Sequence, residues 1–350
     1  MVEIKEHELS RDDLTKTVMK GGGHLVILGA GASRALSDKH NGDKNGIELP
    51  LMNELVSKVG LEDLILEAGF KGKTDDFEAV YTKIAVSASK DLLDRLNNKI
   101  AEYFKNIEIP DDVTNYDLLL VGLRGRDVVA SFNWDPLLHQ AHRRLVAHGI
   151  DPADLPHVLY LHGNVAIGYC DDDRTMGRPH GPCFKCGKRY KPTPLLYPVA
   201  KKNYESNNFI KAQWDVVKEY MHYARIVTVY GYGAPASDVA AMSLLQEGWG
   251  KNTDRQFEQF ELIIRPGADE QEARDSWDAF IHTHHYGVWT DFSDSYIALT
   301  PRRTVETWFA QYIDAKFVDA NPYPKFDNVD ALIDWIRPLI KAEVQSPKAG

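Results

Sequence analysis

The chain has 350 residues, of which 43% are hydrophobic and 26% are charged, and its formal net charge is −10. These are ordinary values for a globular protein of one large domain or two smaller ones. The negative charge argues against direct nucleic-acid binding, because such binding depends on neutralising phosphates. Three cysteines are too few for a disulfide scaffold. The N-terminus has no apolar signal core, and no apolar run approaches the roughly 20 residues that cross a bilayer. We therefore expect a soluble, cytoplasmic protein without membrane contact.

The most informative stretch covers residues 24–34 and reads H-L-V-I-L-G-A-G-A-S-R. The apolar run from Leu25 to Leu28, closed by glycine, is typical of a strand buried on both faces of a parallel sheet. Gly29 and Gly31 allow the backbone to turn sharply and to approach a ligand closely. A strand that leads into a helix N-terminus is the arrangement that binds a pyrophosphate.

Two residues that follow this turn bear on the prediction. Ser33 is expected to cap the following helix and to offer its hydroxyl to a phosphate. Arg34 stands where the dinucleotide-binding fingerprint has its third glycine. A strand-to-turn junction without a ligand is therefore an alternative for this motif taken alone.

Apolar periodicity predicts helices alternating with strands along the chain. Helices are expected over 9–20, 49–55, 76–104 (one long helix or two abutting ones), 136–148, 208–223, 237–245 with Ser237 as its cap, 269–282, 302–314 and 327–341. Strands are expected over 127–132, 157–161, 195–199, 225–230, 260–264 and 287–290. This alternation predicts a doubly wound α/β fold with a Rossmann-like parallel sheet.

The predicted elements divide the chain into four parts. The sheet domain is expected to comprise residues 1–50, 111–167 and 193–300, with a helical cap over 51–110, a cysteine-containing insertion over 168–192 and C-terminal helices over 301–350. The turn-rich segment 37–48 is expected to be mobile, and it follows the glycine turn closely enough to act as a gate over a pocket.

Polar groups follow several of the predicted strands. Asn133 and Asp135 follow the strand at 127–132, His162 follows the strand at 157–161, and Gly231-Tyr232-Gly233 with Asp238 follow the strand at 225–230. In an open parallel sheet, ligands bind in the crevice beyond the carboxyl ends of the strands. These groups are therefore expected to converge with the glycine turn on one pocket.

Each of these residues also has a purely structural interpretation. Asn133 suits a turn, and Asp135 suits a helix N-cap before Pro136. His162 suits a hydrogen-bonded turn histidine, and Asp238 suits the favourable end of a helix dipole. Their occurrence at successive strand ends nevertheless favours a shared pocket.

The four blocks G-A-G-A-S, F-N-W-D, L-H-G and G-Y-G-x-P-x-S-D, spread over residues 22–245, resemble the sirtuin-like domains of prokaryotic NAD-consuming proteins. They are more distantly similar to the sirtuin deacylases. The resemblance implies that the NAD pyrophosphate binds to Gly29, Ala30, Gly31, Ala32 and Ser33. It also implies that Gly231 and Tyr232 lie near the adenosine end, with Asp238 on the next helix.

For catalysis, the resemblance implies that Asn133 positions a water or a ribose hydroxyl beside the nicotinamide ribose. It assigns Asp135 to the nicotinamide side and His162 to the general base. The chemistry agrees with these roles. Cleavage of the N-glycosidic bond develops an oxocarbenium-like ribose, so a near-neutral base such as histidine suffices without a strong protein nucleophile.

Three segments differ from the deacylase pattern. Phe132 replaces the glutamine that usually precedes the asparagine, and G-I-E-L-P at 46–50 stands in place of P-D-F-R. L-L-Y-P at 195–198 stands in the neighbourhood of the F-G-E-type segment that lines the acyl-lysine tunnel. These differences favour NAD cleavage over deacylation.

The segment Cys183-Phe184-Lys185-Cys186 has the form of a zinc knuckle. A structural zinc site needs four ligands, and Cys170 is the only other cysteine. His180 is our candidate for the fourth ligand, and an acid from residues 171–173 is the alternative. Sirtuins often carry a four-cysteine zinc ribbon at this place, and three loose thiols without metal are the competing interpretation.

The sequence therefore favours an NAD⁺ hydrolase that releases nicotinamide and ADP-ribose. The resemblance implies a toxic effector in anti-phage abortive infection, a homo-oligomer, and a partner such as a translocase-type ATPase or an Argonaute-like protein. A protein deacylase or ADP-ribosyl transferase is one alternative, and a non-catalytic subunit that senses NAD or ADP-ribose is another. The apolar faces of 302–314 and 327–341 are candidate subunit contacts, with packing against the chain's own core as the alternative.

Overall fold

A computed structural model of the protein describes residues 23–197, 204–205, 207–234, 238–251, 255, 258–281 and 285–345. The helix expected at 9–20 and the expected cap Ser237 lie outside these residues. Within these ranges, no helix has the length and apolar character needed to cross a membrane.

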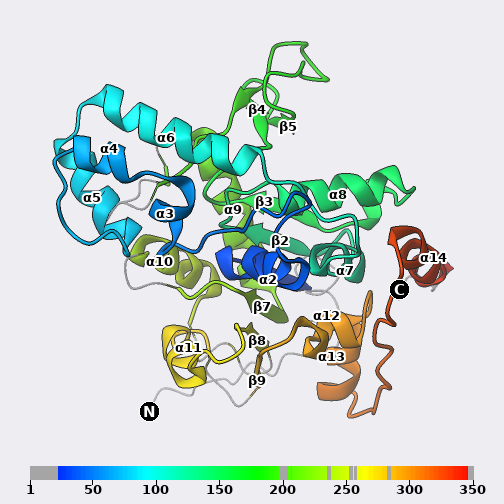
Figure 1. Ribbon diagram of the computed structural model, residues 1–350. Coiled ribbons are helices and arrows are strands. Elements are labelled where there is room, and N and C mark those ends of the chain that lie inside the picture. Colours follow the sequence, from blue (N-terminus) through cyan, green and yellow to red (C-terminus); the bar gives the residue numbers. More distant parts are fainter. Residues whose placement is uncertain are drawn as a thin grey trace, which may run out of the picture.

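A six-stranded parallel sheet forms the centre of the molecule (Figure 1), and its strands lie in the order β3-β2-β1-β7-β8-β9. The strands are β1 His24–Leu28, β2 Val128–Ser131, β3 His157–Tyr160, β7 Ile226–Tyr230, β8 Gln259–Ile263 and β9 Tyr286–Trp289. Counted along the chain, this order is 3-2-1-4-5-6, which is that of the doubly wound dinucleotide-binding fold. The predicted Rossmann-like sheet is therefore confirmed, and the strand order reverses between β1 and β7.

Helices cover both faces of this sheet. They are α2 Ala30–His40, α7 Asn115–Gly122, α8 Leu137–Ala147, α9 Asn208–Tyr223, α10 Val239–Trp249 and α11 Glu270–Ser276. The central strand β1 shows why its apolar run is continuous. Val26 and Leu28 belong to a core shared with α2, α7 and α8, whereas Leu25 and Ile27 belong to a second core shared with α9 and α10. Each face of the strand is buried, so alternation with polar residues is absent.

Three predicted elements differ from the structure. Residues 49–54 of the helix expected over 49–55 are not helical, and helix α3 Leu55–Val59 begins only at the last expected residue. Residues 195–197, the described part of the expected strand at 195–199, form no strand; the Leu196 N–H donates instead to the His162 carbonyl at 2.9 Å. The helix expected over 269–282 ends early, at Ser276. The periodic segment 76–104 forms two abutting helices, α5 Phe77–Ser87 and α6 Lys90–Lys105, which Ser89 separates as the N-cap of α6.

The helical cap predicted over 51–110 is present. It consists of α3 Leu55–Val59, α4 Glu62–Glu67, α5 and α6, which lie together to one side of the sheet (Figure 1). Its apolar residues, such as Leu96 and Ile100, join the same core as β1. The cap is therefore packed onto the sheet domain.

The segment 37–48 is not the gate that the sequence suggested. Helix α2 continues to His40, and the buried Asp43 carboxylate then accepts hydrogen bonds from the N–H groups of Asn45, Ile47 and Glu108 at 2.7–2.8 Å. These bonds hold the loop at the C-terminal end of α2. An 11-residue helix is about 16 Å long, so the loop lies far from the glycine turn at the N-terminal end.

The insertion over 168–192 forms a second, three-stranded antiparallel sheet of its own, β5-β4-β6. Its strands are β4 Gly168–Cys170, β5 Thr175–Gly177 and β6 Lys191–Pro192. Figure 1 shows β4 and β5 projecting from one end of the molecule. The predicted cysteine-containing insertion is therefore a separate small unit.

The C-terminal helices α12 Tyr296–Leu299, α13 Thr304–Tyr312 and α14 Val329–Gln345 pack against the chain's own core. Trp308 and Ile336 are fully buried, which favours internal packing over subunit contact for these apolar faces. The buried Arg302 fixes α14 to the sheet domain: it donates to both Glu343 carboxylate oxygens at 2.7 Å and to the Leu123 and Asp154 carbonyls.

Candidate functional site

The turn after β1 and the turn after β7 pack backbone against backbone where the strand order reverses. Gly29 N–H donates to the Tyr230 carbonyl at 3.0 Å, and Gly31 N–H donates to the Gly231 carbonyl at 2.9 Å. A Cβ on Gly29 would lie 2.5 Å from the Gly231 carbonyl oxygen. Gly231 itself has a φ of +65°, and a Cβ there would lie 2.1 Å from the Ala32 nitrogen. The glycines are thus required by the contact between the two turns.

A cavity of about 450 Å³ opens beside these turns, at the carboxyl ends of the strands. Its wall includes residues that follow five strands: Ala30 and Gly31 after β1, Asn133 after β2, His162 after β3, Gly231, Tyr232 and Asp238 after β7, and Arg265 after β8. A second cavity of about 60 Å³ adjoins it and is lined by Ser33 and Asp135 as well as by Asn133 and His162. The structure therefore brings the polar groups from successive strand ends to one place.

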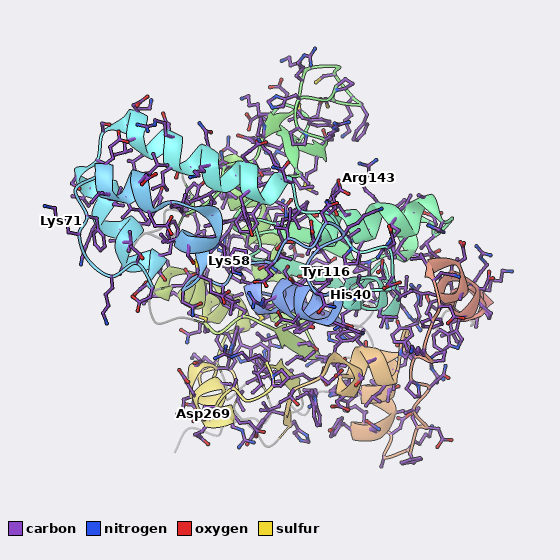
Figure 2. The ribbon with its side chains drawn as sticks, in the orientation of Figure 1. His40, Lys58, Lys71, Tyr116, Arg143 and Asp269 are labelled. Atoms are coloured by element: carbon purple, nitrogen blue, oxygen red, sulfur yellow. The ribbon has the colours of Figure 1, made fainter. Side chains whose placement is uncertain are left out.

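The Asn133 side chain is held in one orientation. Its Nδ2 donates to the Gly29 carbonyl at 2.9 Å and to Ser33 Oγ at 3.1 Å. Tyr116 of α7, which lies beside α2 (Figure 2), completes the group with a 2.7 Å hydrogen bond to Ser33 Oγ. Since Nδ2 is used within the protein, Oδ1 is the side-chain atom that can accept a hydrogen bond from a ligand; no described residue donates to it.

Asp135 takes part in the same buried group. Its Oδ2 accepts from Ser33 Oγ at 2.8 Å, and its Oδ1 accepts from the Leu137 N–H at 3.1 Å, at the start of α8. Burial raises the pKa of Asp135 to about 6. Ser33 lies within α2, which begins at Ala30, and does not cap that helix as predicted. Its hydroxyl supports Asn133 and Asp135 instead.

His162 belongs to a second polar group. Its Nε2 lies 2.8 Å from Tyr204 Oη, and Tyr204 Oη donates to Asp238 Oδ1 at 3.0 Å. Tyr232 Oη donates to the other oxygen of Asp238, also at 3.0 Å. Asp238 is the N-cap residue of α10, but its carboxylate makes no capping hydrogen bond there and accepts from the two tyrosines instead. Phe132 stacks on Tyr232 and contacts the edge of His162, with ring centroids 4.2 and 4.7 Å apart.

The segments that differ from the deacylase pattern also border the cavities. Leu49, Pro50, Leu51 and Met52 line the smaller cavity, and Leu196 lines the larger one. Tyr197 packs on the Trp134 ring, with centroids 5.1 Å apart. The stretch just after 37–48, rather than that loop itself, therefore reaches the site.

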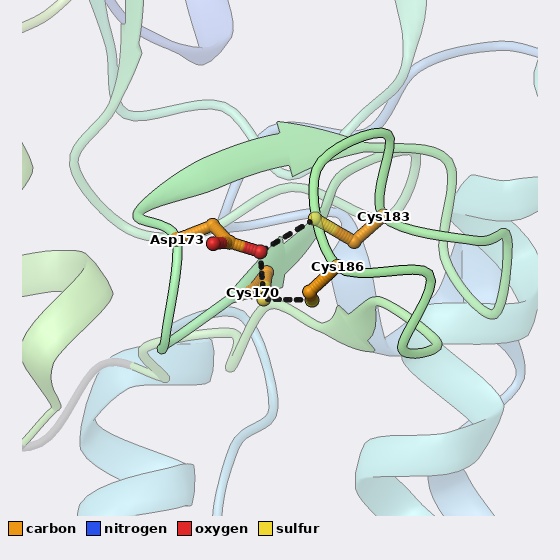
Figure 3. A group of neighbouring side chains, drawn as sticks. All are labelled: Cys170, Asp173, Cys183 and Cys186. Atoms are coloured by element: carbon orange, nitrogen blue, oxygen red, sulfur yellow. Dashed lines mark hydrogen bonds between the residues drawn. The ribbon is translucent and has the colours of Figure 1, made fainter.

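The three cysteines do come together, and the fourth group beside them is Asp173 (Figure 3). The ligand atoms of Cys170, Asp173, Cys183 and Cys186 all lie within 4.8 Å of one another. The sulfurs of Cys170 and Cys186 are 3.7 Å apart, close to the roughly 3.8 Å between two sulfurs of a tetrahedral zinc site. His180, our candidate for this position, is not in the group. The His180 backbone N–H donates to the Tyr190 carbonyl, and Asp173, one of the alternative acids at 171–173, lies with the cysteines.

Several contributors to the site have no signal in the sequence. Tyr116 and Tyr204 supply hydroxyls to the two polar groups, and Asn164 ties the loops after β2 and β3 by donating to the Asn133 and Asp135 carbonyls at 3.2 and 2.6 Å. These residues come from segments distant from their partners along the chain. Only the position of Asn164, two residues after His162, could have suggested it.

A scan against protein-family models found no match, and neither did a search of curated proteins. Among solved structures, the chain is similar to a mutant Sir2 homologue in complex with ADP-ribose, at 13% identity and a TM-score of 0.40, covering 88% of this chain and all of that one. It is also similar to a Sir2 homologue–NAD complex (14% identity, TM-score 0.37, 94% of each chain). A third is Sir2 bound to an acetylated peptide (13% identity, TM-score 0.36, 87% of this chain and 98% of that one). The strand order of this chain by itself gives the doubly wound fold.

Proposed function

We propose that the protein is an NAD⁺ hydrolase that cleaves the bond between nicotinamide and ribose. The observation that carries the proposal is the orientation of Asn133, whose Nδ2 is held by Gly29 and Ser33 so that Oδ1 is left to accept from a ligand. His162 lines the same two cavities. An acceptor and a base beside one cavity are what activation of a water molecule requires.

The dimensions of the site support a dinucleotide. A cavity of about 450 Å³ falls within the usual range for ligand sites. Ala30 and Gly31, at the N-terminal end of α2, form part of its wall, where a helix dipole favours a pyrophosphate. The nicotinamide end would then lie toward Asn133 and the adenosine end toward Gly231.

The reaction uses one water and no strong protein nucleophile. As the N-glycosidic bond breaks, its electron pair leaves with the nicotinamide, which becomes neutral, and positive charge develops on the ribose. Asn133 Oδ1 accepts a hydrogen bond from the water and orients its oxygen toward the ribose carbon. His162 takes the proton that the water loses as the new C–O bond forms. The products are nicotinamide, ADP-ribose and a proton.

The test is to incubate the purified chain with NAD⁺ and to measure nicotinamide and ADP-ribose by chromatography, with and without an acetylated peptide. A hydrolase releases nicotinamide without the peptide. Release only in the presence of the peptide would support a deacylase, and NAD⁺ binding without turnover would support a sensing subunit. Asn133→Ala should lose activity, whereas Asn98→Ala, an exposed asparagine on α6, should keep it.

The resemblance also supports, as further proposals, a role in anti-phage defence through NAD depletion, a homo-oligomer and an ATPase or Argonaute-like partner. Light scattering on the purified chain tests the oligomer, and phage challenge of cells expressing the wild type or Asn133→Ala tests the defence role. A fully active monomer that needs no partner would contradict both the homo-oligomer and the partner.

We also propose that the insertion binds a structural zinc ion. Three thiolates and one carboxylate are donors that zinc accepts, and the spacing of the Cys170 and Cys186 sulfurs suits tetrahedral coordination. Such a metal would hold the short strands β4, β5 and β6 together.

A further inference from the structure

The group around His162 contains a chain of hydrogen bonds that determines where the histidine carries its proton. His162 Nε2 lies 2.8 Å from Tyr204 Oη, which in turn lies 3.0 Å from Asp238 Oδ1. Tyr232 Oη lies 3.0 Å from Asp238 Oδ2. His162, Tyr204 and Asp238 are buried and Tyr232 is partly buried, so the hydrogen bonds between them are shielded from bulk water.

The single proton of the Tyr204 hydroxyl determines the direction of its bond with His162. An ionised carboxylate only accepts, and each tyrosine hydroxyl has a single proton. With both tyrosines donating to Asp238, the proton of Tyr204 is already committed. Burial, followed by the charge of Asp238, raises the pKa of Tyr204 far above its ordinary range, so the phenol keeps that proton. Tyr204 Oη can therefore only accept from His162 Nε2.

We infer that Tyr204 and Asp238 are positioning residues that hold His162 with its proton on Nε2, so that the basic lone pair of the neutral ring is on Nδ1. The inference deepens the proposed function and rests on it for its catalytic meaning. It assigns the proton-accepting atom of the general base, and it adds Tyr204, which no sequence motif indicated, to the residues that support the reaction.

The same arrangement stabilises the product of proton transfer. When Nδ1 accepts a proton, the ring becomes an imidazolium, and the Asp238 carboxylate lies 3.8 Å from Nε2. A buried carboxylate that orients a histidine and stabilises its charged form has the same effect in serine proteases. In this protein the Tyr204 hydroxyl carries the orienting hydrogen bond, and the Trp214 ring packs on Tyr204 with centroids 4.7 Å apart.

The inference is tested by nitrogen NMR on the full chain labelled with ¹⁵N-histidine. His162 is one of 13 histidines, and the missing signal of His162→Gln assigns it. In the wild type we expect a single Nε2–H tautomer with a slowly exchanging proton. Tyr204→Phe keeps the ring and removes the acceptor, so this proton should exchange quickly. Tyr232→Phe removes one of the two hydroxyls that donate to the Asp238 carboxylate but leaves the bond between Tyr204 and His162 in place. The Nε2 proton of His162 should therefore stay protected in this variant.

A kinetic measurement accompanies the spectra. Tyr204→Phe should lower kcat for NAD⁺ cleavage about 10-fold, a part of the roughly 10²–10⁴-fold that a general base supplies, with KM nearly unchanged. A wild-type His162 protonated on Nδ1 overturns the inference, as does a Tyr204→Phe variant that keeps the protected Nε2 proton. Because the wild-type spectrum needs no turnover, an Nε2–H tautomer in a protein that does not cleave NAD⁺ would refute the proposed function and leave the assignment of the proton standing.

Discussion

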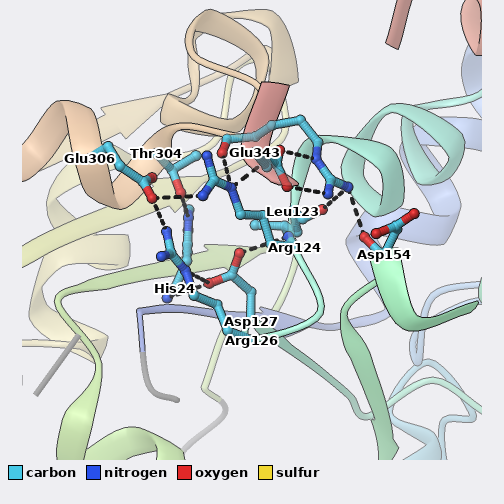
Figure 4. A network of polar contacts seen from close by, with 10 residues as sticks. His24, Leu123, Arg124, Arg126, Asp127, Asp154, Thr304, Glu306 and Glu343 are labelled. Carbon is cyan, nitrogen blue, oxygen red and sulfur yellow. Dashed lines mark hydrogen bonds and ion pairs between the residues drawn. The ribbon is translucent and has the colours of Figure 1, made fainter. Parts of the chain in front are cut away.

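The two ends of the parallel sheet both bury polar side chains, but with different chemistry. At the amino ends of β1 and β2, charged groups dominate: Arg126 pairs with Glu306, and the Asp127 carboxylate accepts from the His24 N–H at 3.1 Å (Figure 4). At the carboxyl ends, hydroxyl, amide and aromatic groups dominate, around the carboxylates of Asp135 and Asp238.

The difference separates stability from function. The ion pairs at the amino end connect the sheet to α13 and α14, and their residues do not line the 450 Å³ cavity. At the carboxyl end, hydrogen bonds orient side chains along the wall of a 450 Å³ cavity. We therefore expect substitutions at the amino end to change the free energy of unfolding, and substitutions at the carboxyl end to change turnover.

The largest effect on turnover is expected from substitution of His162, which lies just beyond the carboxyl end of β3. His162→Ala should lower NAD⁺ turnover by about 10²-fold or more, because the proton of the attacking water loses its acceptor. The matched control is His157→Ala, at the exposed amino end of the same strand, which should keep wild-type turnover. Nicotinamide release measures both variants. Near-normal turnover in His162→Ala would remove this residue from the mechanism.

At the amino end, Arg302→Ala should lower the free energy of unfolding by about 3 kcal/mol. The substitution removes the bidentate partner of the partly buried Glu343 carboxylate, which keeps only Arg124 at 3.3 Å, and it leaves the Leu123 and Asp154 carbonyls without their donor. The exposed neighbour Arg303 provides the control, and Arg303→Ala should change stability by about 0.5 kcal/mol or less. Urea unfolding measures both. Equal stability of the two variants would mean that the ion pairs at this end contribute little.

The two ends should also respond to pH with opposite sign. Burial lowers the pKa of His24 from 6.5 to about 3, so the unfolded chain binds a proton that the folded protein does not. Between these values the free energy of unfolding falls as the pH falls, by up to about 1.4 kcal/mol per pH unit. Asp135 has the opposite effect, because burial raises its pKa from 3.8 to about 6. Its contribution to the free energy of unfolding is fully present below pH 3.8 and is lost as the pH rises through 6.

Urea unfolding at pH 4.5 and pH 7 of two variants separates these contributions. His24→Gln should lose less stability in acid than the wild type, because the group that charges only on unfolding is gone. Asp135→Asn should lose more, because the compensating group is gone. If the free energy of unfolding changed equally with pH in the wild type and in both variants, the opposite effects of His24 and Asp135 would be contradicted.

The smallest effect on the free energy of unfolding of the parallel sheet is expected from the insertion, because it forms a separate sheet of its own. Purified protein should carry about one zinc per chain, and Cys183→Ser should lose it, because a structural site needs all four ligands. His180→Ala should keep the metal and serve as the control, since Asp173 occupies the fourth position. Metal analysis by mass spectrometry measures both, and freshly prepared protein without zinc would favour three free thiols.

Much of the fold was predictable from local pattern. The continuous apolar run of β1 and the helix over 208–223 follow from periodicity, and the latter matches α9 residue for residue. Short elements such as α7 and β6 were missed, because a two-residue strand or a nearly all-apolar helix has no period to detect. Residues 195–197, the described part of the strand expected over 195–199, form no strand, because an apolar run suits irregular chain packed on a core as well as it suits a strand.

By itself, the sequence determined the alternation of strands and helices, and with it which residues follow the carboxyl ends of parallel strands. That is why Asn133, His162 and Asp238 could be placed together in advance. Only the tertiary structure decided which side-chain atoms remain available to a ligand. Tyr116 bonds to Ser33 and Tyr204 bonds to His162, and in each pair the two residues are too far apart along the chain for a sequence motif to relate them. The tertiary structure also placed Asp173, and not His180, beside the cysteines. The path of a loop depends on its contacts with residues distant in the sequence, and composition does not reveal these contacts.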